Sequence, residues 1–387
     1  MKTVIHYKWG PYLPITEAWI YGQINNLKKY RPIVYCTDTE NLDIYPTDSI
    51  RALGLSQGKS APKYFLNKAF NKIFNFCPSF YIALGKDKPA LIHAHFGPSG
   101  YHFLGLKKIF KLPLITAFYG YDLGVFTRRY PKWEKRYKRL FREGEFFLAE
   151  GNHMKNCLIG LGCPRDKIIV QHQGVDLGRI QFEPRRLNRD EGVKILVFGR
   201  FTEKKGIPYA VEAFGLVKQA HPNLKLRLTI IGESDGGVQG EEEKKGIFRL
   251  IGKYNLGKNI NLVGYQPQPG FLKELLYHHI FIHPSIHASN GDNEGGAPVS
   301  IIEASASGMP VLSTKHCDIP EVVIDGESGY LVAERDTDAL RDRLEFLVLN
   351  PRIWEKMGLA GRKHIEQNYD IEKQICRLEE IYDTSLN

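Results

Sequence analysis

Residues 288–312 read Ala-Ser-Asn-Gly-Asp-Asn-Glu-Gly-Gly-Ala-Pro-Val-Ser-Ile-Ile-Glu-Ala-Ser-Ala-Ser-Gly-Met-Pro-Val-Leu, a polar, glycine-rich run that turns into an apolar one. This pattern predicts a loop, then a short helix, then a buried strand. Pro298 suits the first helical position, because its missing N–H is harmless there and its φ is already set. Gly308 followed by Pro310 predicts the end of the helix. The face that must be buried carries Val299, Ile302 and Ala306.

The junction between this loop and this helix offers backbone N–H groups and the positive end of a helix dipole. Such a junction suits an anion, for example a diphosphate. Two carboxylates, Glu294 in the loop and Glu303 in the helix, lie beside the same place. Because ionised carboxylates accept hydrogen bonds and repel phosphates, this pair favours recognition of hydroxyl groups, as on ribose and a sugar. An ordinary capped helix after a flexible loop is the alternative interpretation.

Apolar runs alternate with helical patterns through the first half of the chain. Helical segments, for example 17–30 and 101–110, lie between these runs. Strands that alternate with helices predict right-handed crossovers and a parallel, doubly wound sheet. The predicted strands of this sheet are 4–7, 32–36, 91–96, 114–119, 146–149 and 168–171.

A second alternating series follows residues 182–192, which are rich in Arg and Glu and predict a linker. We therefore expect an α/β protein with two doubly wound parallel-sheet (Rossmann-like) domains facing a cleft, residues 1–182 and 193–370. Ligands of open α/β sheets bind at the carboxyl ends of the strands, so a ligand site is expected in the loops that follow the strands. The predicted strands of the second sheet are 194–200, 226–232, 260–264, 280–284, 310–314 and 330–332.

Length and composition place the chain among globular proteins. At 387 residues it exceeds one ordinary core, so about two domains are expected. Its 43% hydrophobic and 25% charged residues argue against extended disorder, and no apolar run reaches the roughly 18 residues that span a bilayer. Residues 2–7 read as a strand and not as a signal peptide. Six scattered cysteines without metal-like spacing indicate reduced thiols, so we expect a cytoplasmic location.

The charge of the chain is distributed unevenly. Residues 1–190 contain 30 Lys and Arg against 15 Asp and Glu, a net charge of +15, whereas the remainder carries −5. A strongly basic half predicts an anionic partner, such as a membrane surface, a lipid phosphate or a nucleic acid. A solvated basic surface that maintains solubility is the alternative.

The first predicted strand of the second half leads into a basic loop at Gly199-Arg200-Phe201-Thr202-Glu203-Lys204-Lys205-Gly206. Gly199 allows a ligand to approach the backbone closely, and Arg200 offers a fork that matches phosphate oxygens. Lys205 adds a point charge, so these cations and the helix end at Pro298 are expected to clamp a diphosphate from two sides. No Walker A motif occurs, and no GxGxxG opens the first domain, so P-loop and NAD-type sites lack support.

Motifs along nearly the whole chain occur in an order that resembles the family 4 retaining glycosyltransferases of the GT-B fold. Within that family the chain is similar to bacterial enzymes of exopolysaccharide assembly of the colanic-acid type. No single motif is specific, but their order and spacing together are a strong signal. The matching stretches are Pro14–Ile20, Ile92–Gly97, Thr116–Asp122, Gly174–Asp176, Gly199–Gly206 and Glu294–Val311.

The resemblance implies a site for a nucleotide-sugar donor, with UDP as the expected nucleotide. It implies that Arg200 and Lys205 hold the diphosphate, that Glu303 takes the ribose hydroxyls, and that Glu294 contacts the sugar ring. Glu294, Arg200 and Lys205 are then the catalytic residues, because cations and the helix end stabilise the leaving diphosphate. Neither a metal ion nor a cofactor is expected. The implied donor-binding residues are Gly199, Arg200, Lys205, Glu294, Ala297, Pro298, Val299 and Glu303.

The resemblance also implies that the first domain binds the acceptor, a saccharide or a lipid-linked saccharide, and that the C-terminal helix 371–387 joins this domain. His95, Tyr119 and Asp122 are the expected acceptor-side residues. Tyr119 stands where the family pattern has a histidine, and tyrosine does not act as a base near neutral pH. Eight residues separate the two carboxylates where the family pattern has seven. A catalytically degenerate binding protein for nucleotide-sugars or glycans, or a sugar-nucleotide epimerase, is the alternative.

Residues 128–142 are basic and interleaved with aromatic side chains. This pattern suits an anionic membrane interface or a lipid diphosphate, so we expect a peripheral position at the inner face of the membrane. The alternative is a helix that docks its apolar face on the first sheet and leaves its cations solvated. Nucleic acid is disfavoured, because the rest of the chain has no nucleic-acid module. The expected membrane or lipid contacts are Arg128, Arg129, Lys132 and Trp133.

Overall fold

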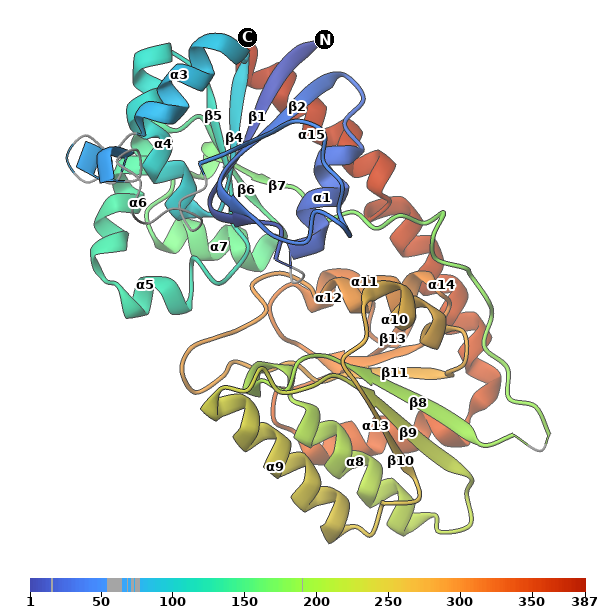
Figure 1. Ribbon diagram of the computed structural model, residues 1–387. Helices are drawn as coiled ribbons and strands as arrows, with labels where there is room; N and C mark the ends of the chain where they lie inside the picture. Colours follow the sequence, from blue (N-terminus) through green and yellow to red (C-terminus); the bar gives the residue numbers. More distant parts are fainter. Residues whose placement is uncertain (15–16, 54–64, 68, 71–72, 74–76, 190) are drawn as a thin grey trace. The chain divides into compact units, whose positions relative to one another are not determined.

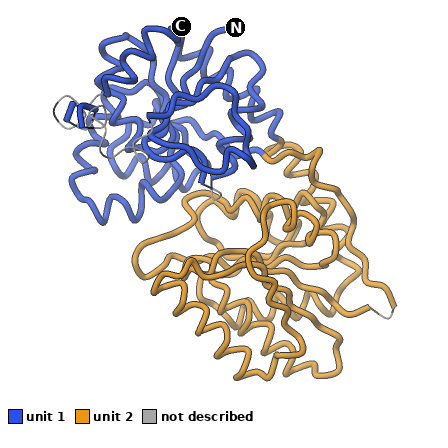
Figure 2. The backbone as a smooth tube through the Cα atoms, viewed as in Figure 1, with its two compact units in different colours: residues 1–174, 371–387 blue, residues 175–370 orange. Residues whose placement is uncertain are grey.

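The computed structural model describes residues 1–14, 17–53, 65–67, 69–70, 73, 77–189 and 191–387. Figure 1 shows two β-sheets, each accompanied by helices on its faces. The chain divides into two compact units, residues 1–174 with 371–387 and residues 175–370 (Figure 2). The first domain therefore ends at residue 174 and not at 182, and the C-terminal helix is part of it.

The first unit contains, within its described residues, a seven-stranded parallel sheet in the order β3-β2-β1-β4-β5-β6-β7. Its strands are β1 (Lys2–Tyr12), β2 (Tyr30–Thr39), β3 (Ile50–Ala52), β4 (Leu91–His95), β5 (Leu114–Ala117), β6 (Phe146–Ala149) and β7 (Ile168–Val170). Its helices are α1 (Ala18–Asn25), α3 (Pro78–Asp87), α4 (Gly97–Phe110), α5 (Val125–Arg129), α6 (Lys132–Glu143), α7 (Asn152–Gly160) and α15 (Ile371–Leu386).

The second unit has a six-stranded parallel sheet in its described part, with the order β10-β9-β8-β11-β12-β13. Its strands are β8 (Val193–Phe198), β9 (Leu226–Ile231), β10 (Ile260–Gly264), β11 (Ile280–His283), β12 (Val311–Thr314) and β13 (Gly329–Val332). Its α-helices are α8 (Ile207–Ala220), α9 (Val238–Lys253), α10 (Gln268–Leu275), α11 (Val299–Ala306), α12 (Ile319–Val322), α13 (Thr337–Leu349) and α14 (Trp354–Asn368).

Every strand that the alternating pattern predicts is present, most of them with shifted ends. The short edge strand β3 was not predicted, because Ile50, Arg51 and Ala52 form no buried apolar run. The helix predicted over 17–30 ends at Asn25, since Tyr30 already begins β2. The helix predicted to begin at Pro298 begins at Val299, and Pro298 takes the preceding cap position.

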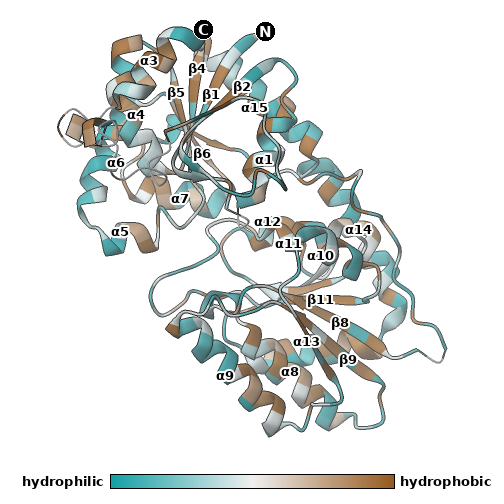
Figure 3. Cartoon of the chain, in the orientation of Figure 1, coloured by the Kyte–Doolittle hydropathy of each residue, from teal (hydrophilic) through white to brown (hydrophobic). Residues whose placement is uncertain are grey.

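Both sheets bury apolar side chains on both faces, as parallel sheets covered by helices do. In β11, Ile280 and Ile282 pack into one core of the second unit, whereas Phe281 packs into the core on the opposite face. Figure 3 shows strands of both sheets in the hydrophobic colours, among them β1, β4, β8 and β11. This arrangement leaves polar residues to the strand ends, where the loops of the candidate site begin.

Arg185, within the segment 182–192 that was predicted as a linker, packs onto the second unit and is only 4% exposed. The Arg185 guanidinium donates to the carbonyl oxygens of His278 at 2.8 Å and Leu275 at 2.7 Å, and to Ser307 Oγ at 3.2 Å. A buried guanidinium needs acceptors for its donors, and residues at and after the ends of α10 and α11 supply them. Composition predicted the linker wrongly because it does not reveal such partners.

Helix α15 is bound to the first unit by packing and by one buried carboxylate. Its apolar side, with Ile371, Ile375, Leu378 and Ile381, is buried as its periodicity predicts. Glu379, 1% exposed, accepts the backbone N–H groups of Lys28 at 2.7 Å and Lys29 at 2.5 Å. The carboxylate thereby caps the turn that precedes β2.

Helix α6 docks its apolar face on the core of the first unit. Trp133, Tyr137, Leu140 and Phe141 are at most 5% exposed and belong to this core. Gly97 makes room for the helix, because a Cβ at this position would lie 2.4 Å from the Phe118 ring and 2.8 Å from the Tyr137 ring. Trp133 is therefore a core residue, and its predicted role as a membrane contact is wrong. Arg128, Arg129 and Lys132 remain exposed.

Candidate functional site

Two loops that are far apart in the sequence meet at the carboxyl edge of the second sheet. Strands β8 and β11 are neighbours, with Ile280–Ile282 paired to Ile195–Val197. The loop after β8 carries Gly199–Gly206, and the loop after β11 leads through Pro284 to Pro298. Neighbouring parallel strands end at the same edge of a sheet, so their loops converge.

Gly206 determines how closely these loops approach each other. Its φ is +62°, and a Cβ at this position would lie 2.0 Å from the carbonyl oxygen of Pro284. Glycine adopts this left-handed conformation without strain and leaves space for the carbonyl. The close approach positions the preceding residue, Lys205, against the second loop.

Lys205 and Glu294 form a buried ion pair. Lys205 Nζ lies 2.9 Å from Oε1 and 3.0 Å from Oε2 of Glu294, and the two side chains are 15% and 6% exposed. Burial alone raises the pKa of Glu294, but Lys205, with His283 and Lys204, outweighs burial and holds this pKa well below its ordinary value. Burial also lowers the pKa of Lys205, and Glu294 offsets part of that shift. Each charge thus stabilises the ionised form of the other.

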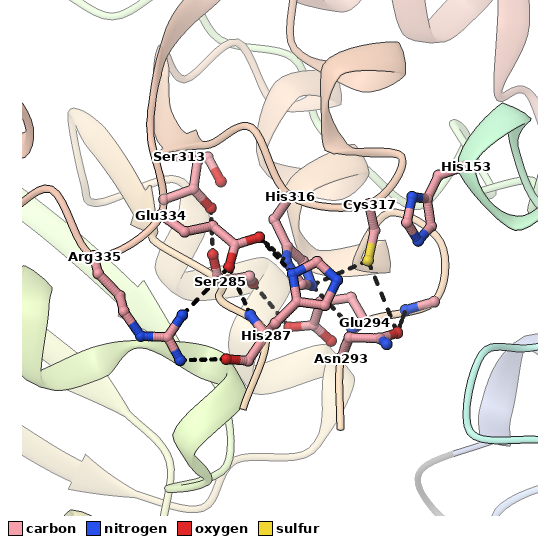
Figure 4. A network of polar contacts seen from close by, with 12 residues as sticks. His153, Ser285, His287, Asn293, Glu294, Ser313, His316, Cys317, Glu334 and Arg335 are labelled. Atoms are coloured by element: carbon pink, nitrogen blue, oxygen red, sulfur yellow. Dashed lines mark hydrogen bonds and ion pairs between the residues drawn. The ribbon is translucent and has the colours of Figure 1, made fainter. Parts of the chain in front are cut away.

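Further contacts fix the orientation of the Glu294 carboxylate (Figure 4). Ser285 Oγ donates to Glu294 Oε1 at 2.8 Å, and His283 Nε2 lies 3.5 Å from the same oxygen. A lysine ammonium has three donors, and among the described residues only the Glu294 carboxylate accepts from Lys205 Nζ. At least one donor of Lys205 is therefore left for a ligand.

His316 connects the Glu294 backbone to a second carboxylate. The Glu294 N–H donates to His316 Nε2 at 3.1 Å, so this nitrogen carries no proton. His316 Nδ1 must then carry the proton, which it donates to Glu334 Oε1 at 2.7 Å. His316 is fully buried, and burial lowers its pKa, which agrees with a neutral ring. Glu334 also accepts from the backbone N–H of His287 at 2.8 Å (Figure 4).

We expect His316→Leu to lower the free energy of unfolding by about 1–3 kcal/mol, because a buried amide and a carboxylate lose their partner. His316→Gln should recover part of this loss, since its amide oxygen can accept the Glu294 N–H. Urea unfolding at neutral pH measures both. His221→Leu, at the C-cap of α8 where the half-buried ring contacts Glu345, serves as the control for losing a less buried histidine with a carboxylate partner. A loss for His316→Leu no larger than that for His221→Leu would contradict the role of His316.

Glu303 lies within α11 and is 4% exposed. Gln268 Nε2 donates to Glu303 Oε1 at 2.5 Å. Burial raises the pKa of Glu303 to about 7, although Gln268 and Arg179 act in the opposite direction. Hydroxyl donors from a ligand would favour the ionised carboxylate. Glu303 is thus suited to bind vicinal hydroxyl groups near neutral pH.

The junction between the loop and α11 also carries unpaired donors. Arg200 is exposed, and its guanidinium pairs with no side chain of the described residues. Free amides at a helix N-terminus and a free guanidinium both suit phosphate oxygens. In the described part of the chain, no protein acceptor faces the backbone N–H groups of Gly296, Ala297, Val299 and Ser300.

In the first unit, His95 forms a hydrogen bond with Tyr119. His95 is 1% exposed; its Nδ1 lies 2.7 Å from Tyr119 Oη and its Nε2 lies 3.0 Å from His6 Nδ1. The His95 ring is stacked on the rings of His6 and His93 at centroid distances of 5.3 and 4.6 Å. Both nitrogens of His95 have hydrogen-bond partners, so His95 connects Tyr119 to His6.

Asp122 supports the backbone of the same region. It is 1% exposed, and its carboxylate accepts the N–H groups of Gly97 at 2.8 Å and Tyr119 at 3.1 Å. Burial raises the pKa of Asp122 to about 6, and the backbone donors oppose the rise. Asp122 thus connects the loop after β5 to the start of α4.

Comparisons with known proteins match both units. Residues 28–179 match the family model "Glycosyltransferase Family 4", and residues 179–364 match "Glycosyl transferases group 1". The chain is 32% identical over 296 residues to WcaL of Salmonella typhimurium, named as a colanic acid biosynthesis glycosyltransferase, covering 74% of this chain and 69% of WcaL. It is 33% identical over 299 residues to the amylovoran biosynthesis glycosyltransferase AmsK of Erwinia amylovora, covering 75% and 69% of the two chains. The chain belongs to the family 4 glycosyltransferases.

Solved structures place this glycosyltransferase in the GT-B fold. HepE of Anabaena in complex with UDP and glucose aligns with a TM-score of 0.76 at 14% identity, covering 99% of this chain and all of HepE. Sucrose-phosphate synthase of Thermosynechococcus elongatus aligns with a TM-score of 0.76 at 18% identity and 99% coverage of both chains. The expected fold class is confirmed. Among the described helices of this glycosyltransferase, none is long and apolar enough to cross a membrane.

Sequence reasoning about this glycosyltransferase selected the two loops but not the residues that support them. It assigned Lys205 to a diphosphate and Glu294 to a sugar, whereas the structure pairs the two side chains with each other. It missed Ser285, His316 and Gln268. Ser285 and His316 each follow the end of a buried strand by two residues, which was the signal available. Ile15 and Thr16, within the motif at 14–20, lie outside the described residues.

Proposed function

We propose that this protein is a retaining glycosyltransferase that moves a sugar from a UDP-sugar to a saccharide or lipid-linked saccharide during exopolysaccharide synthesis. The observation that carries the proposal is the set of unpaired donors at one sheet edge: Arg200, the free amides before α11, and a remaining donor of Lys205. These groups match a diphosphate, and the buried carboxyl of Glu303 matches the ribose hydroxyls beside it.

The acceptor hydroxyl attacks the face of the sugar from which the diphosphate leaves, so the configuration at the anomeric carbon is retained. Negative charge grows on the leaving diphosphate as the bond to the sugar breaks. Arg200, Lys205 and the amides at the start of α11 stabilise this charge, which replaces the role of a metal ion. Glu294 orients Lys205 and presents its carboxylate to the sugar ring, while the leaving oxygens take the acceptor proton.

The biological setting in this proposal rests on the named relatives. WcaL and AmsK are named for colanic acid and amylovoran biosynthesis. HepE was solved with UDP and glucose, which supports UDP as the nucleotide. On this proposal the enzyme acts in the cytoplasm, at the inner face of the membrane.

A nucleotide-sugar or glycan binding protein of the same fold is the second candidate. Tyr119 favours it, because the family pattern has a histidine at this position and a tyrosine cannot serve as a base near neutral pH. An epimerase would interconvert donor sugars without any acceptor. Product analysis of UDP-sugars incubated with and without lipid-linked saccharides separates transfer, epimerisation and binding alone.

Titration calorimetry with UDP tests the donor site. Arg200→Ala is expected to weaken UDP binding by about 10-fold to 100-fold, because a charge-assisted contact to the diphosphate is lost. Arg249→Ala, in α9 outside the two loops, is the matched control and should bind UDP as the parent does. Parent-like affinity in Arg200→Ala would contradict the assignment of the diphosphate site.

Exposed cations of the first unit provide a test of the proposed membrane contact. Replacing Arg128, Arg129 and Lys132 by Glu is expected to reduce co-sedimentation with vesicles of anionic phospholipid at low salt, since each basic residue near such a surface adds about 1 kcal/mol. Replacing Lys245, Lys258 and Arg249 of the second unit by Glu makes the same charge change elsewhere. Equal effects of both triple variants would show that only net charge matters.

A further inference from the structure

Three histidines of the first unit lie together on one face of its sheet. Strands β1 and β4 are side by side, with His6 paired in register to His93 (Figure 1). His95 follows His93 by two residues, so both side chains lie on the same face of β4. All three side chains are at most 1% exposed. They belong to the first unit, whereas the proposed donor site belongs to the second.

The three imidazole rings are spaced as they are around a single metal ion. The ring centroids lie 5.1 Å apart for His6 and His93, 5.3 Å for His6 and His95, and 4.6 Å for His93 and His95. Imidazoles that bind one zinc ion have centroids about 5 Å apart. One ring nitrogen of each histidine lies within 4.8 Å of one from each of the others. Nitrogens on one zinc ion are about 3.3 Å apart, so rotations of the rings close the remaining distance.

Tyrosine hydroxyls occupy one nitrogen of two of these rings. His93 Nδ1 lies 2.7 Å from Tyr382 Oη, and His95 Nδ1 lies 2.7 Å from Tyr119 Oη. Histidines that bind metal ions usually have such a partner at the second nitrogen, which fixes the tautomer. With the proton at Nδ1, each of these rings keeps a lone pair at Nε2. His93 Nε2 is buried and has no protein partner within the described residues, which is unusual for a buried polar atom and indicates a ligand.

His6 contributes the third nitrogen. Its Nδ1 lies 3.0 Å from His95 Nε2, and its own Nε2 is buried without a protein partner in the described part of the chain. One proton shared by the two facing nitrogens accounts for their hydrogen bond. When a metal ion binds both lone pairs, this proton moves to His6 Nε2. Each ring therefore stays neutral, and no further proton has to be removed.

The ligand set selects the kind of metal. Burial lowers the pKa of all three histidines, that of His93 to about 3, so the rings are in the neutral form that binds metal ions. Lys8 lowers the pKa of His95 further, and its ammonium group is paired with Glu17. Three imidazole nitrogens suit Zn²⁺ and the neighbouring transition metals, whereas Mg²⁺ and Ca²⁺ require oxygen ligands.

We propose that His6, His93 and His95 bind one Zn²⁺ ion, which joins β1 to β4 inside the first unit. Through Tyr119 and Tyr382, the liganding histidines also hold the loop after β5 and helix α15. The role of the ion is structural. It is separate from the proposed transfer mechanism, in which cations and helix amides of the second unit stabilise the diphosphate.

Equilibrium dialysis of the full chain against Zn²⁺ tests the site. The parent is expected to bind one Zn²⁺ with a dissociation constant of about 1 µM or below, and to unfold at a higher temperature with zinc present. His6→Phe and His93→Phe should each weaken zinc binding at least about tenfold, since even the partners behind metal ligands contribute that much. His287→Gln is the matched control and should bind zinc as the parent does. His287, His316 and Glu334 are another group of possible ligands within the described residues.

Parent-like thermal unfolding of either Phe variant without zinc suffices to interpret its loss of binding. X-ray absorption of zinc bound to the parent in solution counts the histidine ligands and needs no variant, so it decides the matter if neither variant folds. Three histidine ligands are expected, and two or fewer would overturn the site. Absence of zinc binding up to about 100 µM would also overturn it, as would zinc binding that both Phe variants retain and His287→Gln loses.

Discussion

Lys205→Met is expected to lower kcat/KM for sugar transfer by about 10²-fold to 10³-fold, the usual cost of removing one group that stabilises transition-state charge. Met fills most of the space of the lysine but donates no hydrogen bond to the diphosphate. The substitution also leaves Glu294 buried without its cation, which should cost about 3 kcal/mol of unfolding free energy. Initial transfer rates and urea unfolding measure the two effects separately.

The double variant Lys205→Met with Glu294→Gln distinguishes catalysis from folding. Removing both charges eliminates the uncompensated carboxylate, so stability should recover while transfer stays low. Lys245→Met, on the exposed side of α9, controls for the loss of a lysine. Recovery of transfer together with stability in the double variant would show that Lys205 acts only through the fold.

The pH dependence of stability provides a further check on this pair. The folded-state pKa of Glu294 is depressed, so its contribution is present above the unfolded-state pKa of about 4.3 and is lost as the pH falls through the folded value. In Lys205→Met the carboxyl loses its main cation and burial dominates, so its pKa rises. Stability of this variant should therefore decrease as the pH is raised through the new value.

Glu303→Gln is expected to weaken binding of a UDP-sugar by about tenfold to 100-fold at pH 8, because hydroxyl groups lose an ionised acceptor. The parent should also show affinity that falls as the pH drops below about 7, since the carboxyl must give up its proton before it accepts two hydroxyl donors. Glu303→Gln should lose this pH dependence. UDP-glucose is the suitable probe, because its diphosphate has no group that titrates near neutrality.

Calorimetry in two buffers of different ionisation enthalpy measures how many protons are released when UDP-glucose binds. Near pH 7 the parent should release a fraction of a proton on binding UDP-glucose, whereas Glu303→Gln should release none. The raised folded-state pKa means that ionising Glu303 costs stability as the pH rises from about 4.3 to about 7. Glu303→Gln should therefore be more stable than the parent at pH 8. Glu380→Gln, exposed on α15, is the control, and equal proton release by all three proteins would contradict the assignment.

The order of strands and helices followed from the sequence because it depends on local periodicity. Strands such as 146–149 and 260–264 were predicted with the bounds that the structure gives. The predicted boundary at residue 182 failed for a physical reason: Arg185 finds acceptors at and just after the end of α10, which only the folded chain brings near. The predicted membrane contact at Trp133 was wrong for a similar reason. A helical stripe of aromatic residues has the same sequence pattern whether a protein core or a membrane covers it.

The loop and helix at 288–312 illustrate the same division. Their sequence determined the glycine-rich loop, the start of α11 within one residue, and the carboxylates at 294 and 303. Only the tertiary structure decided that Glu294 pairs with Lys205, 89 residues away, and that its backbone N–H donates to His316. The sequence fixes charge and period along the chain, whereas the neighbours of a buried charge depend on which strands are adjacent, here β8 beside β11.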